Sequence, residues 1–365
     1  MGCALSAAAA GANVLLIESD EQLGGTVRQA MIHTIAGLFD DRGEVLNDGL
    51  PMELTERLMR SSPLFQKRRI GKTWVLNADP SAYSEIVRNW ISETPGIDVC
   101  CRARVNSVVV NEGRISSLEY ESNGATHTVN PIAVADTTGT AAVVRLIDDG
   151  LVEDGCALGG FIVRIRGLEP SALQFPKGAG LLREIRKAAQ SGEIPQECST
   201  VWIDTGVYPD EAYAKFNLQQ EQYDANHMRD VADRLIQFLQ TVEGFEDARI
   251  QDYGVLGIRD GGRIHGEYCL TETDVKGGRQ FPDAACRASW PIEHWHPANG
   301  LSLEYLPPGT AYEIPMRSLR VNGFENLWAP GKALCAEPRA QASARMAGTC
   351  WAMGAAVGME MNACR

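Results

Sequence analysis

The start of the chain constrains the fold more than any other stretch, because an alanine-rich segment leads directly into an apolar one. Residues 2–10 are small and favour a helix, and Gly11 stands where such a helix would end. Residues 13–17 then read Asn-Val-Leu-Leu-Ile and close at Glu18, as a strand buried on both faces does. A helix that feeds such a strand is half of a βαβ unit, so we expect a parallel sheet and an α/β fold.

The overall composition limits what the chain can bind. At 365 residues with 44% hydrophobic side chains, it can bury the core of one large domain or of two joined domains. Its formal net charge of −13 disfavours nucleic acid and anionic membrane surfaces as main partners, because both require a basic face. A local basic run, Lys67-Arg68-Arg69, is interpreted as a solvated turn in preference to a binding patch. The oligomeric state stays open.

The cysteines and the N-terminal residues bear on location and metal binding. The ten cysteines include no Cys-x-x-Cys pair and no zinc-type spacing, so we expect neither a disulfide framework nor a bound metal. No basic segment precedes the first apolar stretch, as it would in a signal peptide. No apolar run approaches the ~20 residues that a membrane-spanning helix needs. These features predict a cytoplasmic protein with reduced thiols.

The pattern along the chain predicts one domain interrupted by another. Helices are expected at residues 51–60, from Pro80 onward and at 224–241, and strands at 97–101, 105–111, 114–121, 131–136, 160–165, 200–203 and 327–329. From Ala311 the chain returns to an apolar strand, a glycine and a small-residue helix. We therefore assign residues 1–150 and 310–365 to a discontinuous Rossmann-like domain, and residues 151–309 to an inserted α+β substrate domain.

Several short blocks, in order along nearly the whole chain, resemble one family. They are Gly11–Glu18 with Leu23-Gly24-Gly25-Thr26, Asp79-Pro80 with the strands of residues 97–115, Asp136–Ala141, Leu256–Tyr268, Asn326–Lys332 and Arg345–Gly358. The ordered set is similar to the FAD-dependent oxidoreductases, which bind the flavin on a two-dinucleotide-binding-type fold. Relative to that family we expect the chain to begin one strand late, without the first strand and most of the Gly-x-Gly-x-x-Gly loop.

The resemblance implies FAD as the cofactor and a set of residues around it. Glu18 would accept hydrogen bonds from the adenosine ribose, and glycines would let the backbone approach the ligand. A helix expected to begin near Gly354 would direct its N–H groups at the pyrimidine edge of the flavin, unless Gly354 only permits close helix packing. The residues expected at the cofactor are Glu18, Gly24, Gly25, Thr26, Val105, Thr138, Gly139, Gly331, Lys332, Gly354, Ala355 and Ala356. No histidine or cysteine stands out as a point of covalent flavin attachment.

Three histidines are candidates for chemistry on the substrate. The resemblance places His33 on the loop near the flavin ring, and His294 and His296 where the family carries an acidic residue and a histidine. Glu293 or His294 would take the first of those two places. A histidine could remove a proton before a hydride passes to the flavin. Each histidine by itself could instead be structural.

Two arginines complete the candidate set. Arg259 and Arg263 could hold a substrate carboxylate through paired hydrogen bonds, or stabilise a reduced anionic flavin. The alternative for both is a structural ion pair with Asp260 or Glu267. The sequence leaves these possibilities open.

Three functions follow, in order of preference. The first is an FAD-dependent oxidoreductase that transfers a hydride from a small organic substrate to the flavin. The second is a flavin monooxygenase, which requires a nicotinamide, although no second Gly-x-Gly-x-x-Gly is visible. The third is a non-catalytic flavin-fold remnant that binds a ligand or partner. The substrate and the electron acceptor are not specified by the sequence.

Overall fold

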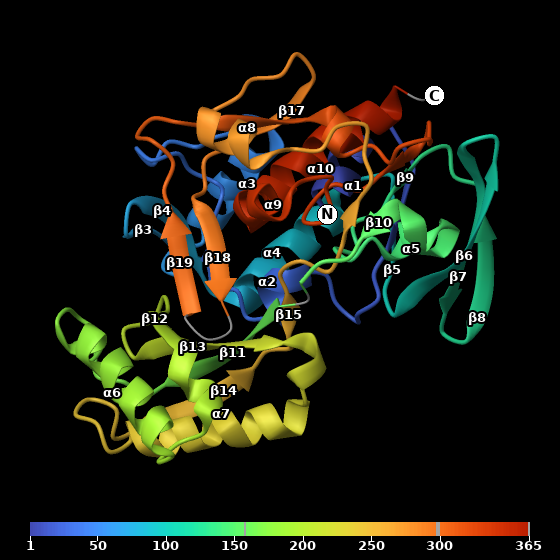
Figure 1. The fold of residues 1–365 in the computed structure, drawn as a ribbon. Helices are drawn as coiled ribbons and strands as arrows, with labels where there is room; N and C mark the ends of the chain where they lie inside the picture. Colours follow the sequence, from blue (N-terminus) through green and yellow to red (C-terminus); the bar gives the residue numbers. More distant parts are fainter. Residues whose placement is uncertain (157, 297–299, 364–365) are drawn as a thin grey trace.

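The chain forms two lobes of unequal size, which Figure 1 shows one above the other. The structure, a computed structural model, describes residues 1–156, 158–296 and 300–363. Residues from about 158 to 258 form the smaller lobe, in green and yellow at the bottom of Figure 1, and the remaining described residues form the larger one. We call these the small lobe and the large lobe.

The large lobe mixes helices with short strands. Its helices are α1 (Gly2–Ala9), α2 (Gly25–Gln29), α3 (Leu50–Met59), α4 (Pro80–Glu93), α5 (Ala142–Ile147), α8 (Glu272–Gly277), α9 (Pro338–Ala344) and α10 (Ala347–Asn362). Its first strands are β1 (Val14–Ile17), β2 (Thr34–Ile35), β3 (Phe65–Ile70), β4 (Thr73–Ala78), β5 (Ile97–Cys100), β6 (Ala103–Asn111), β7 (Arg114–Ser122), β8 (Ala125–Val129) and β9 (Val134–Ala135). The later strands are β10 (Val152–Glu153), β16 (Arg263–Ile264), β17 (Ala284–Ala288), β18 (Ile292–His296), β19 (Gly300–Glu304), β20 (Tyr312–Pro315) and β21 (Leu327–Trp328).

Two parallel strand pairs confirm the α/β fold that the opening segment predicts. β1 pairs with β5 from Val14 opposite Ile97, and β21 pairs with β9 from Leu327 opposite Val134. The strand expected at residues 131–136 is shorter than predicted, since it comprises only two residues. Pro131 supplies no N–H to a strand ladder, which explains the late start.

A three-stranded antiparallel sheet of β6, β7 and β8 stands beside these pairs. The predicted strands at residues 105–111 and 114–121 are confirmed as β6 and β7, and a tight turn joins them: Glu112 and Gly113 both have positive φ, as such a two-residue turn requires. β3 and β4 form a second hairpin, and it contains the basic run of residues 67–69. The interpretation of that run as a solvated turn is therefore wrong, because its side chains alternate between the two faces of β3.

The last helix packs closely on the first. A Cβ at Gly2 would lie 2.9 Å from the Trp351 carbonyl oxygen, and one at Gly354 would lie 3.0 Å from the Cys3 nitrogen. A Cβ at Gly358 would meet Cys3 as well, so small residues are needed where α10 crosses α1. The expectation of a helix beginning near Gly354 is wrong, because α10 begins at Ala347 and Gly354 lies midway along it. Its N–H group is therefore inside the helix, and close packing accounts for the glycine.

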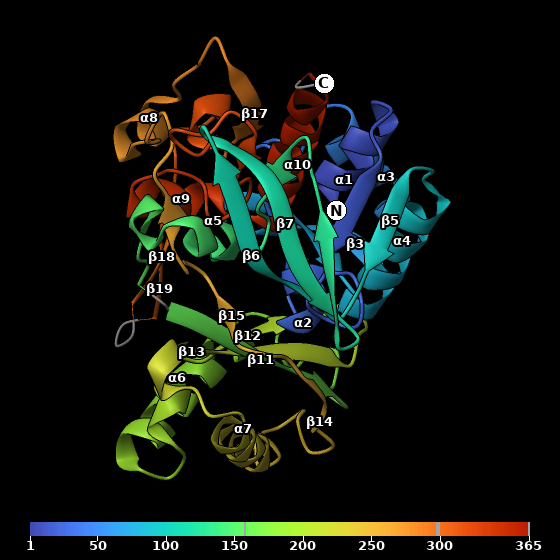
Figure 2. The ribbon, with the colours of Figure 1, turned by 90° about the vertical axis from the view of Figure 1, so that its right-hand side faces the viewer.

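The small lobe is a sheet covered on one side by two helices. The sheet contains β11 (Leu158–Arg166), β12 (Trp202–Thr205), β13 (Glu211–Gln219), β14 (Arg249–Tyr253) and β15 (Gly257–Ile258), and the helices are α6 (Lys177–Ser191) and α7 (Ala225–Leu239). Figure 2 shows the sheet between these helices and the large lobe. One face of the sheet therefore faces the boundary between the lobes.

The packing of residues after β15 bears on the domain division. Leu270 and Ile292 belong to the same hydrophobic core as Trp328 and Met353 of the C-terminal segment. The core of the small lobe instead includes side chains from residues 161 to 248. This packing favours an end of the inserted unit near Ile258 in place of the boundary at 309, and we propose that division.

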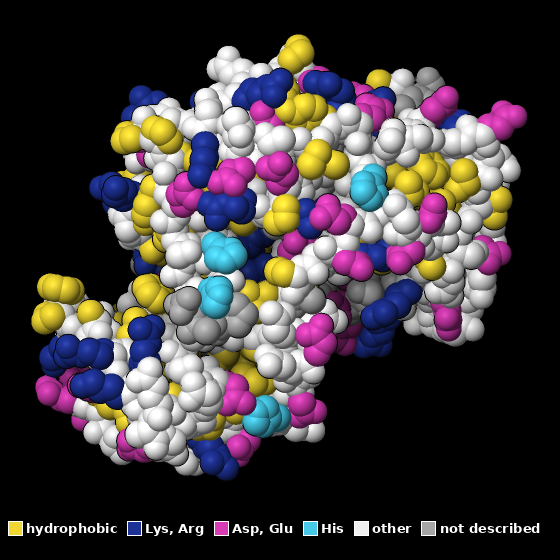
Figure 3. Space-filling model, viewed as in Figure 1, with side chains coloured by type: hydrophobic (Ala, Val, Ile, Leu, Met, Phe, Trp, Pro, Cys, Tyr) yellow, Lys and Arg dark blue, Asp and Glu magenta, His cyan; other side chains and the backbone are white. Residues whose placement is uncertain are grey.

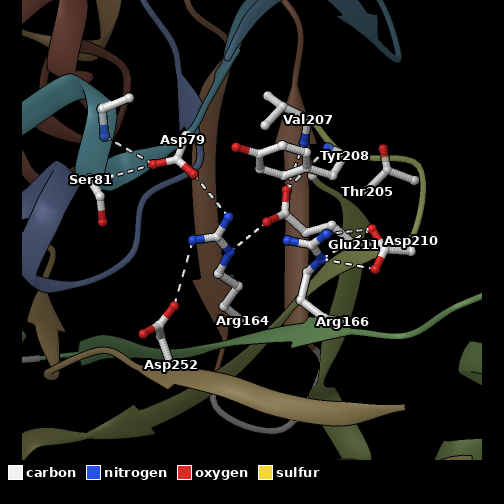
Figure 4. A network of polar contacts seen from close by, with 12 residues as sticks. Asp79, Ser81, Arg164, Arg166, Thr205, Val207, Tyr208, Asp210, Glu211 and Asp252 are labelled. Carbon is white, nitrogen blue, oxygen red and sulfur yellow. Dashed lines mark hydrogen bonds and ion pairs between the residues drawn. The ribbon is translucent and has the colours of Figure 1, made fainter. Parts of the chain in front are cut away.

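A buried ion cluster joins the two lobes (Figure 4). Arg164 on β11 donates to Asp79 at 2.9 Å and pairs with Glu211, while Asp252 lies 3.6 Å away. Asp79 also caps α4, because its carboxylate accepts from the N–H groups of Ser81 and Ala82. A helix of the large lobe is thus tied to a strand of the small lobe. We call Arg164, Asp79, Glu211 and Asp252 the lobe joint.

Surface and helix properties bear on possible partners. On the face in Figure 3, acidic and basic side chains are interspersed and form no extended basic area. No helix among the described residues is long and apolar enough to cross a membrane. Within the same residues, no three His, Cys, Asp or Glu side chains gather as a metal ion would require.

Candidate functional site

The small-lobe sheet supplies the floor of the candidate site. Along β13, alternate side chains point to opposite faces, so Ala214 and Phe216 join the small-lobe core while Tyr213, Lys215 and Asn217 point toward the large lobe. The large lobe covers this floor. The side chains that meet between the lobes are His33, Arg68, Asp204, Tyr213, Lys215, Arg259, Glu293, Trp295 and Arg345. We call this set the interlobe site.

His33 lies at one end of the interlobe site and is held from three sides. Its Nε2 is 3.2 Å from Asp204 Oδ2, and its ring stacks on Tyr213 with centroids 4.0 Å apart. Arg68 donates to the same Asp204 oxygen at 2.5 Å. Although burial favours the neutral acid, His33 and Arg68 lower the pKa of Asp204 well below its usual value. Asp204 is therefore ionised, which favours the His33 tautomer whose Nε2 carries the proton.

The other ring nitrogen of His33, Nδ1, is buried without a hydrogen-bond partner among the described residues. His33 is 3% exposed, and burial lowers its pKa, so the ring is neutral near pH 7. With the proton on Nε2, Nδ1 carries a free lone pair and can accept a proton.

Arg259 crosses the floor at a position where the sheet carries a glycine. Its guanidinium donates to the Gly159 carbonyl and to Asn217 Oδ1, each at 2.8 Å, and lies 4.3 Å above the Trp295 ring. A Cβ at Gly160 would come within 3.0 Å of this guanidinium, so the glycine gives the arginine room. Burial, and next the neighbouring Arg345, lower the pKa of Arg259 to about 9. Its positive charge is thus poorly balanced.

Glu293 is the carboxylate that faces these cations. Its oxygens accept from the indole N–H groups of Trp295 at 2.6 Å and Trp290 at 3.1 Å, and Arg345 lies 3.3 Å away. Burial opposes its ionisation, but Arg345 and Lys215 outweigh that effect and lower the pKa of Glu293. Of the two residues considered for the acidic position, Glu293 is inside the interlobe site, and His294 is exposed.

The charges around Glu293 do not balance. Lys215, Arg259 and Arg345 all act on this one carboxylate. Burial lowers the pKa of Lys215, and Arg259 and Arg345 lower it further, while Glu293 and Asp204 oppose the shift. Buried like charges are costly unless an anion accompanies them. The arrangement therefore favours an additional negative group between the lobes.

The interlobe site continues toward residues expected at the cofactor. Lys332 donates to the Ile258 carbonyl at 2.6 Å, and Gln341 bridges the carbonyls of Arg259 and Lys332. The Lys332 side chain passes beside Gly139, where a Cβ would meet it. Burial lowers the pKa of Lys332, and Arg345 lowers it further. Gly139 and Lys332 are thus adjacent to each other and connected to Arg259.

A second group of cofactor candidates meets at the end of β1. The backbone N–H of Ala103 donates to the Glu18 carbonyl at 2.9 Å, and Glu18 itself donates to Cys100. Val105 packs with Ile17 in a small cluster beside them. The Glu18 carboxylate accepts from the Asp20 N–H at the surface. The structure therefore brings Glu18 and Val105 together.

The remaining cofactor candidates lie at turns. Gly24 and Gly25 precede and begin α2 with positive φ, and Thr26 lies against Gly257 of β15. Asp136 accepts from both the N–H and the hydroxyl of Thr138, which shapes the turn before α5. Ala355 and Ala356 lie within α10, and the Ala355 carbonyl accepts from Ser6 of α1.

Three of the predicted catalytic residues lie outside the interlobe cluster of side chains. Arg263 pairs with Asp260 at 3.3 Å and Glu153 at 3.1 Å and donates to the Ala336 carbonyl, which matches the structural alternative. His294 and His296 are both exposed on β18. The His296 carbonyl accepts from Asn217, which places its backbone at the edge of the floor.

The residues present fit the ring end of a flavin. A Cβ at Gly25 would have no neighbour within 4 Å, and one at Gly331 would meet only the Cys350 sulfur at 3.9 Å, so both backbones have open space beside them. Lys332 and Arg345 supply positive charge near Gly331. The fully buried Thr349 hydroxyl has no partner among the described residues. The open space at Gly331 with Lys332 and Arg345 near it suits a group with carbonyl oxygens that gains negative charge on reduction.

The sequence matches the family described as FAD dependent oxidoreductase over residues 1–148 and 166–364. The match covers most of the chain, so the protein belongs to this family. Its cofactor is accordingly FAD, and its fold is the Rossmann-like α/β fold expected from the sequence.

Several solved structures resemble this chain more distantly. One is a geranylgeranyl bacteriochlorophyll reductase-like protein from Thermoplasma acidophilum, with a TM-score of 0.49 and 10% identity over 99% of this chain and 74% of that one. Another is p-nitrophenol 4-monooxygenase from Pseudomonas putida DLL-E4, with a TM-score of 0.43 and 10% identity over 73% and 67%. A third, anhydrotetracycline hydroxylase from Streptomyces rimosus, has a TM-score of 0.44 and 14% identity over 73% and 51%. No curated protein matches. These likenesses are too distant to carry a function.

Sequence reasoning missed part of the interlobe site. Lys215 and Tyr213 lie on β13, which was not predicted, although Ala-Tyr-Ala-Lys-Phe-Asn-Leu alternates small or apolar with larger polar residues. Asp204 carries no local signal, because its partner His33 is 171 positions away. Arg345 stood in a recognised block without being assigned a role.

Proposed function

We propose that this chain is an FAD-dependent oxidoreductase that oxidises a small organic substrate carrying an anionic group, bound between the lobes. The observation that carries the proposal is the excess of Lys215, Arg259 and Arg345 over the single carboxylate of Glu293. A substrate carboxylate would supply the missing negative charge. The guanidinium of Arg259 and the ammonium of Lys215 can both donate to it.

His33 is the proposed proton acceptor. Its Nδ1 lone pair would receive the proton that the substrate loses, while ionised Asp204 holds Nε2–H and stabilises the imidazolium that forms. Arg68 keeps Asp204 in place, and Tyr213 supports the ring face of His33. Bound FAD supplies the acceptor for the hydride. Lys332 and Arg345 would hold the cofactor side of the site positive.

The proposed hydride transfer and a monooxygenase reaction differ in the compounds that they consume. A monooxygenase would consume oxygen and a nicotinamide for each substrate, whereas hydride transfer from the substrate requires neither for the reductive half-reaction. A ligand-binding remnant would show neither reaction. The free thiols of the described cysteines support the cytoplasm as the proposed location.

Anaerobic flavin bleaching tests the reaction class. The FAD-loaded chain is mixed without oxygen with small hydroxy acids and amino acids, and with their uncharged amides. We expect the visible flavin bands to bleach with an acid and not with its amide, with no nicotinamide present. Bleaching only after NADH or NADPH is added, with substrate-dependent oxygen uptake, would favour the monooxygenase.

His33→Asn separates the chemical role of the ring from its packing. We expect the variant to load with flavin normally but to bleach at least ~100-fold more slowly, as loss of a general base does. The exposed His127→Asn is the control. Normal bleaching by the His33 variant would remove His33 from the mechanism and leave the anion-binding part of the proposal standing.

A further inference from the structure

A separate cavity of about 310 Å³ opens on the large lobe. The β3–β4 hairpin, the loop at residues 39–41 and two stretches between residues 289 and 310 surround it. Its volume is in the range of small-molecule sites. Its aromatic and basic lining side chains are those of Phe39, Arg69, Lys72, Trp74, Trp290 and Tyr305. We call this the hairpin pocket.

The walls of the hairpin pocket are largely aromatic. Phe39 is buried, Trp74 and Tyr305 are partly buried, and Trp290 is 8% exposed. The indole N–H of Trp290 donates to Glu293, so the polar edge of the Trp290 ring faces the interlobe site. Its ring therefore remains as an apolar wall of the pocket. Such walls offer flat surfaces on which a planar ring can stack.

The basic run on β3 gives the pocket its charge. Because side chains alternate along a strand, Lys67 and Arg69 share one face while Arg68 points to Asp204 on the other. Arg69 stands directly across the ladder from Trp74. Lys67 lies over the rings of Phe39 and Trp74. This face of the hairpin is therefore cationic and aromatic together.

Among the described residues, neither Lys72 nor Arg69 has a carboxylate within 4.0 Å. Lys72 instead lies 5.3 Å above the Tyr305 ring. Two acids, Asp40 and Asp41, also line the pocket, and both already accept hydrogen bonds. Asp40 accepts from the N–H groups of Arg42 and Glu44, and Asp41 accepts from the Gly309 N–H at 2.7 Å.

We propose that the hairpin pocket binds a planar aromatic compound that carries an anionic group. The ring would lie among Trp74, Trp290 and Tyr305, and the anionic group would meet Arg69 and Lys72 at the mouth. Aromatic walls recognise the ring, and the two unpaired cations select the charge. The inference does not rest on the proposed function, since the lining side chains of the pocket include none of the interlobe site.

Calorimetric titration of the FAD-loaded chain with 2-naphthoate and with neutral 2-naphthamide tests this site. We expect the carboxylate to bind roughly tenfold or more tightly than the amide, as charge-assisted hydrogen bonds provide. Arg69→Gln with Lys72→Gln should remove that preference. Arg60→Gln is the matched control, because Arg60 is exposed on the same lobe and pairs with Glu56 outside the pocket lining.

A second variant separates this site from the one between the lobes. Lys215→Met with Arg259→Met should leave naphthoate binding at the hairpin pocket intact. Equal affinity for acid and amide, or binding unaffected by the Arg69 and Lys72 substitutions, would overturn the proposal. Loss of binding in the Lys215 and Arg259 variant alone would overturn it too, and would assign naphthoate to the interlobe site.

Discussion

Two charge clusters lie at the boundary between the lobes, and they differ in how their charges are satisfied. In the lobe joint Arg164 faces three carboxylates, and backbone N–H groups satisfy the two closest: those of Ser81 and Ala82 donate to Asp79, and that of Val207 donates to Glu211. In the interlobe site three cations face Glu293. Burial opposes the charge of Arg164, but Tyr213, Glu211 and Asp79 outweigh it and raise its pKa, whereas the pKa of Arg259 falls to about 9.

The difference in how the charges are satisfied distinguishes a structural cluster from a candidate binding cluster. A compensated cluster holds the lobes together without needing a further group. An uncompensated cluster costs free energy until an anion arrives, and such sites are typical of binding and catalysis. We therefore propose a structural role for Arg164 and an anion-binding role for Arg259.

The largest expected effect is the loss of the lobe joint. Arg164→Ala would leave Asp79 and Glu211 buried without their cation, which typically costs about 3–5 kcal/mol of unfolding free energy. Urea unfolding followed by circular dichroism measures it. Arg166→Ala is the control: Arg166 pairs with the more exposed Asp210, and its loss should cost less than ~1 kcal/mol. Equal losses in the two variants would contradict the distinction.

Arg259 should behave in the opposite way. Arg259→Met removes two hydrogen bonds but also relieves an unbalanced charge, so we expect the unfolding free energy to change by less than about 1 kcal/mol. The KM for an acidic substrate should rise by about 10- to 100-fold, as loss of a charge-assisted contact does. A variant that unfolds as readily as Arg164→Ala would show that Arg259 is structural.

Glu293→Gln is expected to lower the unfolding free energy and to raise the affinity for an anionic ligand. Without the carboxylate, Lys215, Arg259 and Arg345 lack their main counter-charge, so the unfolding free energy should fall by about 1–3 kcal/mol. An anionic ligand would then be bound several-fold more tightly, since it alone compensates the cations. Ligand titration at fixed ionic strength checks this, and weaker anion binding would contradict it.

The smallest expected effect is a pH dependence from His33. Its pKa in the folded chain lies below the ordinary 6.5, so its contribution to stability is complete above about pH 6.5 and is lost as the pH falls through the folded value. Between pH 7.5 and 5.5 the natural chain should lose about 1 kcal/mol more than His33→Asn does. His127→Asn should follow the natural chain. Identical pH slopes for all three would exclude this role of His33 burial.

Local patterns predicted much of the fold. Asp79 before Pro80 predicted the start of α4, and apolar residues at helical spacing in 224–241 predicted α7. Each of these patterns lies within a single helix. β3 was misread because the acidic partner of Arg68, Asp204, lies 136 positions away in the sequence. Charge density alone does not reveal such partners.

The candidate site was predicted only in part, for the same reason. His33 and Arg259 came from the resemblance and do lie between the lobes. Lys215 came from neither pattern nor resemblance, since its importance depends on Glu293 and Trp295 of another lobe. Arg263 was grouped with Arg259 on type alone, and only its contacts with Asp260 and Glu153 distinguish the two.

The most direct test compares two affinities of the FAD-loaded chain. One is for a carboxylate analogue of a substrate that bleaches the flavin, and the other is for the matching amide. We predict a preference for the carboxylate of at least about tenfold, abolished in Lys215→Met with Arg259→Met while that variant remains folded. An equal affinity for both compounds in the natural chain would contradict an anion-binding role for the uncompensated cations between the lobes.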